Sequence, residues 1–246
     1  MAKKNTEIVK NGVNPKDVVI SVPDDYSMDI DRSDVKIPSI LLWQKMSDMA
    51  EFEGENVKAG DFVNPVTSDI YGSSFEGAII RYYTTARVYG EKGDDGRKEV
   101  VKYSRDGVHW DDDGSVINPS EFRWTDDGSH AVKSYHYLVL PKGSTIPSML
   151  TFKGSSAKFA KALNANLMFM RPSWRSWFKF FSASEEKNGN KYHVVQAKAQ
   201  PKMLVDEASA SMALELWKST GESVVSSAGM DKDHGAEEFD ANKVNY

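Results

Sequence analysis

Stretches in which apolar and polar residues alternate predict that most of the folded part of this chain is β-structure. Alternation with many β-branched and aromatic residues is typical of strands that bury one face. A polar turn joins the first two of these stretches and an Asn-Gly pair joins the last two, so each pair is expected to form a hairpin. The five predicted strands cover residues 75–89, 99–104, 133–141, 174–183 and 191–199.

Two other segments have the periodicity of helices. The first, residues 154–170, lies between the third and fourth predicted strands, and Ser155 or Ser156 is placed to cap it. The second, residues 206–220, follows the last strand. The apolar side chains that share one face of the first helix are Phe159, Leu163, Leu167 and Met170.

Three strands, a helix and two strands follow one another in the order of the OB-fold, a five-stranded Greek-key barrel that binds oligonucleotides and oligosaccharides. We therefore expect a mainly β protein with few helices, in which an OB-like barrel has one helix between strands 3 and 4. The expected parts are a flexible arm (1–35), the OB-like domain (36–203) with an insertion at 105–131, and a C-terminal helix with an acidic tail (204–246).

Charge is segregated along the chain, although the net charge of −5 is modest. Residues 128–184 contain no Asp or Glu but eight Lys and Arg, whereas acids outnumber bases in the tail. A long segment without acids in an otherwise acidic chain favours a surface that meets polyanions. The OB-like domain is therefore expected to bind nucleic acid.

The stretch RPSWRSWFKFF, residues 171–181, shows how such a surface is built. Side chains alternate between the faces of a strand, so Trp174, Phe178 and Phe180 are expected in the core, and the odd positions combine cations with rings. The odd positions of residues 79–89 and 133–139 do the same. Cations neutralise phosphates while exposed rings stack on bases, which suits a single strand. The predicted binding residues are Arg81, Tyr83, Arg87, Tyr89, Lys133, Tyr135, Tyr137, Lys153, Arg171, Arg175, Trp177 and Lys179.

The same pattern is compatible with ordinary outward-facing residues of strands, because Tyr and Thr favour strands and surface cations are common. A β-bulge would also reverse the parity within any one strand. The absence of acids from this region is what favours a binding surface.

Two segments carry a resemblance to a known group of proteins. The stretch GSTIPSMLTFKGSSAKFAKALNANL with the later KYHVVQAKA, and IPSILLWQKMS with VKAGDFVNPVTSDIYG, resemble phage-encoded single-stranded DNA-binding replication and recombination proteins with an OB-fold. The resemblance covers about residues 37–200. It implies single-stranded DNA as the partner, little sequence specificity, and a place in the host cytoplasm. Without cysteine, the chain cannot carry the zinc knuckle that some such proteins have in the insertion.

The motifs of common enzymes are not found, so we expect no enzyme activity, no cofactor and no metal site. The chain lacks GxxxxGK[ST], GxGxxG, HExxH and GxSxG. Two alternatives stay open: a virion or assembly protein, and a Mg-dependent nuclease that uses Pro23-Asp24 and Asp34-Val35-Lys36. With no long apolar run and no secretory signal, the chain is expected to avoid membranes and stay in the cytoplasm.

The C-terminal tail combines acids with one large apolar side chain. Tethered to a basic surface, such a segment can occupy it until DNA displaces it, and can then bind replication or recombination proteins. A solubilising terminus is the alternative. The residues concerned are Asp231, Asp233, Glu237, Glu238, Phe239 and Asp240.

Deletion of residues 229–246 distinguishes these two roles. If the tail competes with DNA, the truncated protein binds single strands more tightly at low salt, and the difference shrinks as salt screens both interactions. Titration of a fluorescent dT oligomer at two salt concentrations measures this. Unchanged affinity at low salt would contradict the competition.

Overall fold

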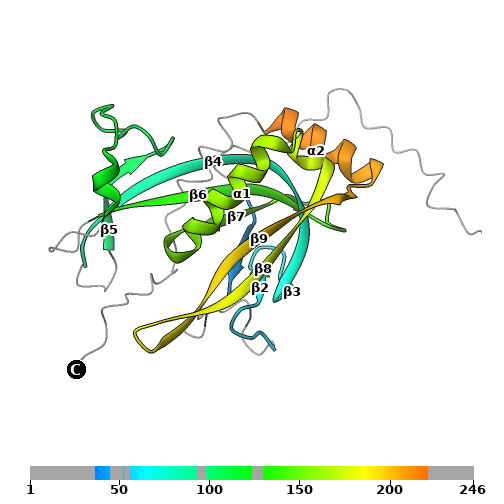
Figure 1. Cartoon of the computed structure of the whole chain (residues 1–246), viewed down its shortest axis with the longest axis horizontal. Coiled ribbons are helices and arrows are strands. Elements are labelled where there is room, and N and C mark those ends of the chain that lie inside the picture. The colour runs from blue at the N-terminus through cyan, green and yellow to red at the C-terminus, as the bar shows by residue number, and fades with distance from the viewer. Residues whose placement is uncertain (1–36, 45–51, 53–55, 93–97, 124–129, 221–246) are drawn as a thin grey trace, which may run out of the picture. The chain divides into compact units, whose positions relative to one another are not determined.

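The computed structural model describes residues 37–44, 52, 56–92, 98–123 and 130–220, which form a curled sheet and two α-helices (Figure 1). The chain divides into two units, Met1–Val35 and Lys36–Tyr246. The first unit, which corresponds to the predicted arm, lies outside the described residues.

Nine strands form the sheet in the order β3-β2-β1-β7-β6-β4-β8-β9, and β5 pairs with β4 beside this path. Neighbouring strands are antiparallel except for β1 and β7, which run parallel. The strands are β1 (Ser39–Leu42), β2 (Phe62–Asn64), β3 (Asp69–Gly72), β4 (Ser74–Lys92), β5 (Lys98–Ser104), β6 (Ala131–Pro141), β7 (Ser148–Phe152), β8 (Ser176–Lys187) and β9 (Asn190–Leu204). The helices are α1 (Ala157–Phe169) and α2 (Glu207–Ser219), with 3-10 turns at Pro119–Phe122, Gly154–Ser156 and Ser173–Arg175.

The 19-residue strand β4 organises the sheet, because three strands pair with it. Strand β6 pairs along one edge, opposite residues 77–88. Strands β8 and β5 share the other edge, β8 opposite residues 74–77 and β5 opposite residues 86–92. Between them, no described strand pairs with this edge of β4, so the sheet is split there.

Strand β4 also contains one extra residue in its pairing with β6. Ile79 lies opposite Val139 and Arg81 lies opposite Leu138, so Ile80 forms a bulge. A bulge reverses the alternation of a strand. Odd-numbered side chains of β4 therefore face α1 before Ile80, and even-numbered ones do so after it.

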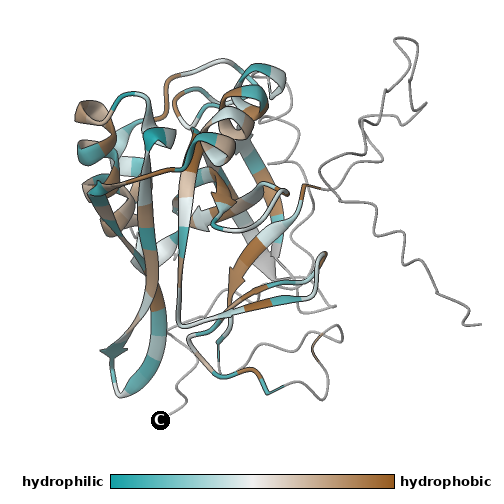
Figure 2. Ribbon diagram, turned by 90° about the vertical axis from the view of Figure 1, so that its right-hand side faces the viewer, coloured by the Kyte–Doolittle hydropathy of each residue, from teal (hydrophilic) through white to brown (hydrophobic). Residues whose placement is uncertain are grey.

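Apolar side chains are buried on both faces of the sheet, and hydrophobic and hydrophilic segments alternate along the strands (Figure 2). On one face, Tyr137, Phe152 and Phe178 pack with Leu163 of α1. On the other face, Leu138 packs with residues of α2. Because both faces are covered, nearly every residue of β6 is buried, although Lys133, Ser134 and His136 interrupt its apolar sequence.

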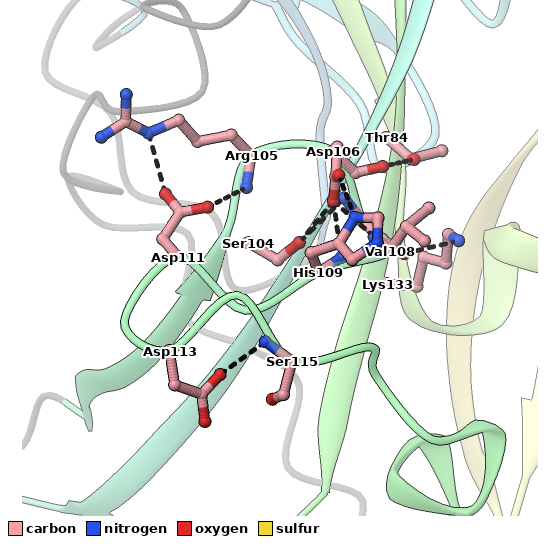
Figure 3. A network of polar contacts seen from close by, with 11 residues as sticks. Thr84, Ser104, Arg105, Asp106, Val108, His109, Asp111, Asp113, Ser115 and Lys133 are labelled. Carbon is pink, nitrogen blue, oxygen red and sulfur yellow. Dashed lines mark hydrogen bonds and ion pairs between the residues drawn. The ribbon is translucent and has the colours of Figure 1, made fainter.

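The insertion between β5 and β6 has a small core of its own, formed by Trp110 and Ile117 against Ala86 and Ala131. A hydrogen-bonded loop precedes this core (Figure 3). In it, Asp106 Oδ1 accepts hydrogen bonds from the backbone N–H groups of residues 108 and 109, both at 2.7 Å, and from the Ser104 hydroxyl at 3.1 Å.

The second carboxylate oxygen of Asp106 lies 2.8 Å from Nδ1 of His109. Partial desolvation raises the pKa of Asp106, but the hydrogen bonds from His109, Val108 and Ser104 outweigh it and hold this pKa well below its usual range. The ionised carboxylate therefore fixes the start of the insertion.

Most elements predicted from the pattern are confirmed. Both hairpins and both helices form, and the Asn188-Gly189 turn has the positive φ angles, 52° and 77°, that its sequence favours. Ser156 is at the N-cap position of α1, as predicted, but its hydroxyl makes no capping hydrogen bond and instead accepts one from the Val195 N–H of β9. On the same strand, the Gln44 side chain exchanges two hydrogen bonds with the backbone of His193.

The fold is mainly β, as predicted, but a five-stranded Greek-key barrel is not confirmed. Strands β1, β2, β3 and β7 extend the sheet, and β6 pairs with β4 and β7. Neither described helix is long and apolar enough to cross a bilayer.

Replacement of Asp106 with Ala is expected to lower the free energy of unfolding by about 1–2 kcal/mol, as loss of a capping carboxylate does. Because the folded state lowers the pKa of this group, its contribution is present above the ordinary pKa of an Asp and is lost as the pH falls through the lowered value. Urea denaturation at neutral pH measures the loss. The exposed Asp112→Ala in the same loop is the matched control and should change little.

Candidate nucleic-acid interface

The twelve predicted binding residues do not share one face of the sheet. After the bulge, Tyr83 lies opposite His136 and Arg87 lies opposite Val132, so these odd positions of β4 align with even positions of β6. Directly opposed residues point to the same face. Tyr83, Arg87 and Tyr89 therefore point away from the side that Lys133, Tyr135 and Tyr137 face.

The predicted exposure of two tyrosines of β6 is wrong. Tyr137 is fully buried and Tyr135 is 7% exposed, because the odd positions of this strand face α1. The Tyr137 hydroxyl donates a hydrogen bond of 2.7 Å to Oδ1 of Asn164, and burial raises its pKa. These rings are part of the core and cannot stack on a base.

Trp177 is also buried, at 3% exposure, although an exposed ring was predicted. The Trp177 side chain does point to the face opposite Phe178, as predicted. This part of the sheet is covered on both faces, however, so the ring is buried. Nζ of Lys142 lies 5.6 Å from the centre of the Trp177 ring. Trp174, predicted to be core, precedes the strand in a 3-10 turn and is half-buried. Trp177 is therefore a core residue, whereas Trp174 packs against the apolar cluster under α2 and stays partly exposed.

Lys133 has a structural partner, since its Nζ donates a hydrogen bond of 2.9 Å to the Gly107 carbonyl of the insertion. Desolvation lowers the pKa of Lys133, and the nearby Asp106 partly offsets this. On the other face, the Tyr83 ring stacks on His136 at 4.6 Å, and the Arg87 guanidinium lies 5.4 Å from the Tyr103 ring.

The other predicted residues lie at the ends of the helices and strands. Lys153 follows β7 and is half-buried, whereas Arg171, Arg175 and Lys179 are exposed around the start of β8. Of the twelve predicted residues, only Arg81 and Arg171 line the groove described next.

A groove of about 700 Å³ lies at the split edge of β4, between the C-terminal ends of α1 and α2. The two helices pack on opposite faces of the sheet, and residues at both of their C-terminal ends line the groove at its edge. The volume falls within the range of about 300–1,000 Å³ that is usual for ligand sites. The lining residues are Ile79, Arg81, Tyr82, Asn164, Leu167, Met168, Met170, Arg171, Pro172, Ser173, Trp174 and Trp217.

Hydrogen bonds hold both walls of this groove to β4. The Ser173 hydroxyl donates to the Ile79 carbonyl at 2.7 Å, which fixes the 3-10 turn beside the unpaired edge. The Arg81 guanidinium donates from Nε to the Thr220 hydroxyl at 3.1 Å and from Nη2 to the Trp217 carbonyl. A cation at the C-terminus of a helix is favourable, so Arg81 joins α2 to the sheet.

Three aromatic rings contribute to the groove. Trp174 and Trp217 lie 5.5 Å apart at an angle of 39°, and Arg81 lies 5.1 Å from the centre of the Trp217 ring. Tyr82 is 41% exposed and Trp217 is 40% exposed. Burial raises the pKa of Tyr82, and a hydrogen bond with Asn164 partly offsets this.

The groove is a positively charged aromatic site, because two arginines line it and none of its lining residues is acidic. Guanidinium groups bind phosphate oxygens, and partly exposed rings stack on planar groups. The arrangement can therefore bind a planar anionic ligand.

Sequence reasoning missed Tyr82, Trp217 and Met168 of this groove. Tyr82 is at an even position of a strand whose odd positions are predicted to bind, and alternation alone does not locate the bulge at Ile80. Trp217 gave no signal beyond an aromatic residue in the last turn of an amphipathic helix. The predicted tail residues and the Pro23, Asp24 and Asp34-Val35-Lys36 nuclease pattern lie outside the described residues.

One protein family matches the chain. The family, described as Pam3 phage gp34-like protein, matches residues 23–226. No curated protein and no solved structure matches the chain. The matched range includes every described strand and helix.

Replacement of Trp177 with Ala is expected to destabilise the protein by about 3–5 kcal/mol, because it leaves a large cavity in a packed region. Urea denaturation gives the free energy of unfolding. Trp217→Ala, which removes a ring that is 40% exposed, is the matched control and should cost clearly less. Equal stability of Trp177→Ala and the wild type would contradict the burial of this ring.

Proposed function

Since the chain belongs to the Pam3 phage gp34-like family, we propose that it is a phage protein that binds single-stranded DNA through the groove at the split edge of β4. The observation that carries the proposal is the composition of this groove, which combines three rings with two arginines and no acid. Little sequence specificity is expected, because every base has a face on which a ring can stack.

The rings favour a single strand over a duplex. Stacking of a base on an aromatic side chain contributes about 1–3 kcal/mol, but the bases of a duplex are already stacked on one another. Tyr82 and Trp217 keep about two fifths of their surface exposed, so an unpaired base can reach them. Duplex DNA can offer only its phosphates to the same site.

The cations around the groove favour a phosphate backbone. Arg81 is held by two hydrogen bonds, and a guanidinium has five N–H donors, so further donors are available to a ligand. Arg171 on the facing wall is exposed. Each phosphate that these groups neutralise releases counterions, which makes binding weaker as salt rises.

Exposed lysines on the neighbouring hairpin can extend this path. Lys179 of β8 lies directly opposite Lys198 of β9, and both are exposed. Like charges in directly opposed positions destabilise a sheet. A phosphate between them would relieve this repulsion, although Glu76, opposite Lys179 on β4, already offsets part of it.

The proposal is tested by titration of fluorescent dT and dA oligomers and a duplex of equal length at two salt concentrations. We expect the wild type to bind both single strands far more tightly than the duplex, with affinity falling as salt rises. Trp217→Ala should weaken single-strand binding by about 1–3 kcal/mol. Equal affinity for duplex and single strand, or no dependence on salt, would contradict the proposal and favour a virion or assembly protein.

A matched pair of arginine variants distinguishes binding at the groove from attraction of DNA to any exposed cation of the protein. Arg171→Ala and Arg123→Ala remove one exposed cation each, the first at the groove and the second in the insertion. Only Arg171→Ala should reduce the slope of log affinity against log salt by about 1. Equal effects of the two variants would mean that the groove is not the site, even if single strands bind.

A further inference from the structure

The last two residues of α1 carry exposed apolar side chains at the rim of the groove. Phe169 is 87% exposed, the largest fraction of any large apolar side chain in the part of the chain that the structure describes. Met168 beside it is 66% exposed. Exposure of two such neighbours leaves apolar area in water that a ligand could cover.

Phe169 is held in a fixed place relative to the groove. Met168 and Met170 on either side of it line the groove, and so does Arg171. The Met170 N–H donates to the Asn166 carbonyl at 3.1 Å, which closes the last turn of α1. The Phe169 ring therefore projects from a rigid helix end rather than from a loop.

Apolar side chains next to a nucleic-acid site have a known physical use. Phe, Leu, Ile and Met can enter between base pairs as wedges, and unstacking one step costs a few kcal/mol. The cost is lowest at the end of a duplex, where the last pair stacks on one side only. A freed base needs a new partner, and the rings of Tyr82, Trp174 and Trp217 are near the wedge.

We propose that Met168 and Phe169 form a wedge that opens the last base pair of a duplex next to a single-stranded tail. The ligand is thus a junction between single-stranded and double-stranded DNA, with the tail in the groove and the Phe169 ring against the exposed pair. This inference rests on the proposed function, because the groove must bind the tail. Arg171, two residues after Phe169, is placed to contact a phosphate at the junction.

The experiment compares four ligands: a dT oligomer, a blunt hairpin, and the same hairpin with a 5′ or a 3′ dT tail. In the tailed hairpins, 2-aminopurine lies in the last pair on the strand without the tail, so the base that stacks in the groove is not the probe. The wild type should bind one tailed hairpin about tenfold more tightly than the dT oligomer, and 2-aminopurine fluorescence should rise as its base unstacks. Phe169→Ala should bind the dT oligomer within about twofold of the wild type but lose both effects.

Two further variants control for the ring itself. Phe169→Trp keeps a large ring and should retain junction opening. Val116→Ala removes another exposed apolar side chain, 67% exposed and distant in sequence in the insertion, and should behave as the wild type.

The possible outcomes separate this inference from the proposed function. Failure of the wild type to bind the dT oligomer would overturn the groove as a single-strand site and the wedge with it. Binding of the dT oligomer without a rise in 2-aminopurine fluorescence would overturn the wedge alone. Retained opening in Phe169→Ala would also overturn it, and a change of oligomeric state in that variant by light scattering would then assign Phe169 to self-association.

Discussion

The extra residue in β4 is the constraint on which both faces of the sheet depend. Ile80 joins the apolar cluster under α2, whereas Ile79 before it belongs to the cluster under α1. With the shift in register, Arg81 points to the α2 side and Tyr82 to the α1 side. A strand without the bulge would reverse every later side chain of β4, so Arg81 would lose its hydrogen bonds to the end of α2.

The groove follows from this constraint and from the split in the β4 edge. Strand β8 leaves β4 after Gly77, and β5 joins it only at Ala86, so the turn that contains Ser173 and Trp174 fills part of the gap. Because backbone and side-chain hydrogen bonds fix both walls, little ordering is required when a ligand binds. Preorganisation of this kind lowers the free-energy cost of association.

The sequence predicted elements whose signals are local and missed arrangements that depend on distant contacts. The Asn188-Gly189 turn and the apolar face of α1 carry their own signals, and both hairpins form as expected. Strands β1 and β7 are only four and five residues long and are stabilised by their partners, so their local pattern is weak. The predicted binding face rests on the odd or even numbering of residues within each strand. Neither the bulge at Ile80 nor the burial of both faces at Trp177 can be inferred from alternation alone. Only Arg81 and Arg171 among the predicted residues therefore reach the groove.

The side-chain hydrogen bonds to β9 have a consequence for solubility. Within the described residues, β9 pairs only with β8, and such an edge exposes backbone groups on which a strand of another molecule can add. Here the Ser156 hydroxyl accepts a hydrogen bond from the outward N–H of Val195, and the Gln44 side-chain oxygen accepts one from the outward N–H of His193, both at 3.0 Å. Two side chains from distant parts of the chain thus act as a substitute strand, and they protect this edge against intermolecular β-sheet growth and aggregation.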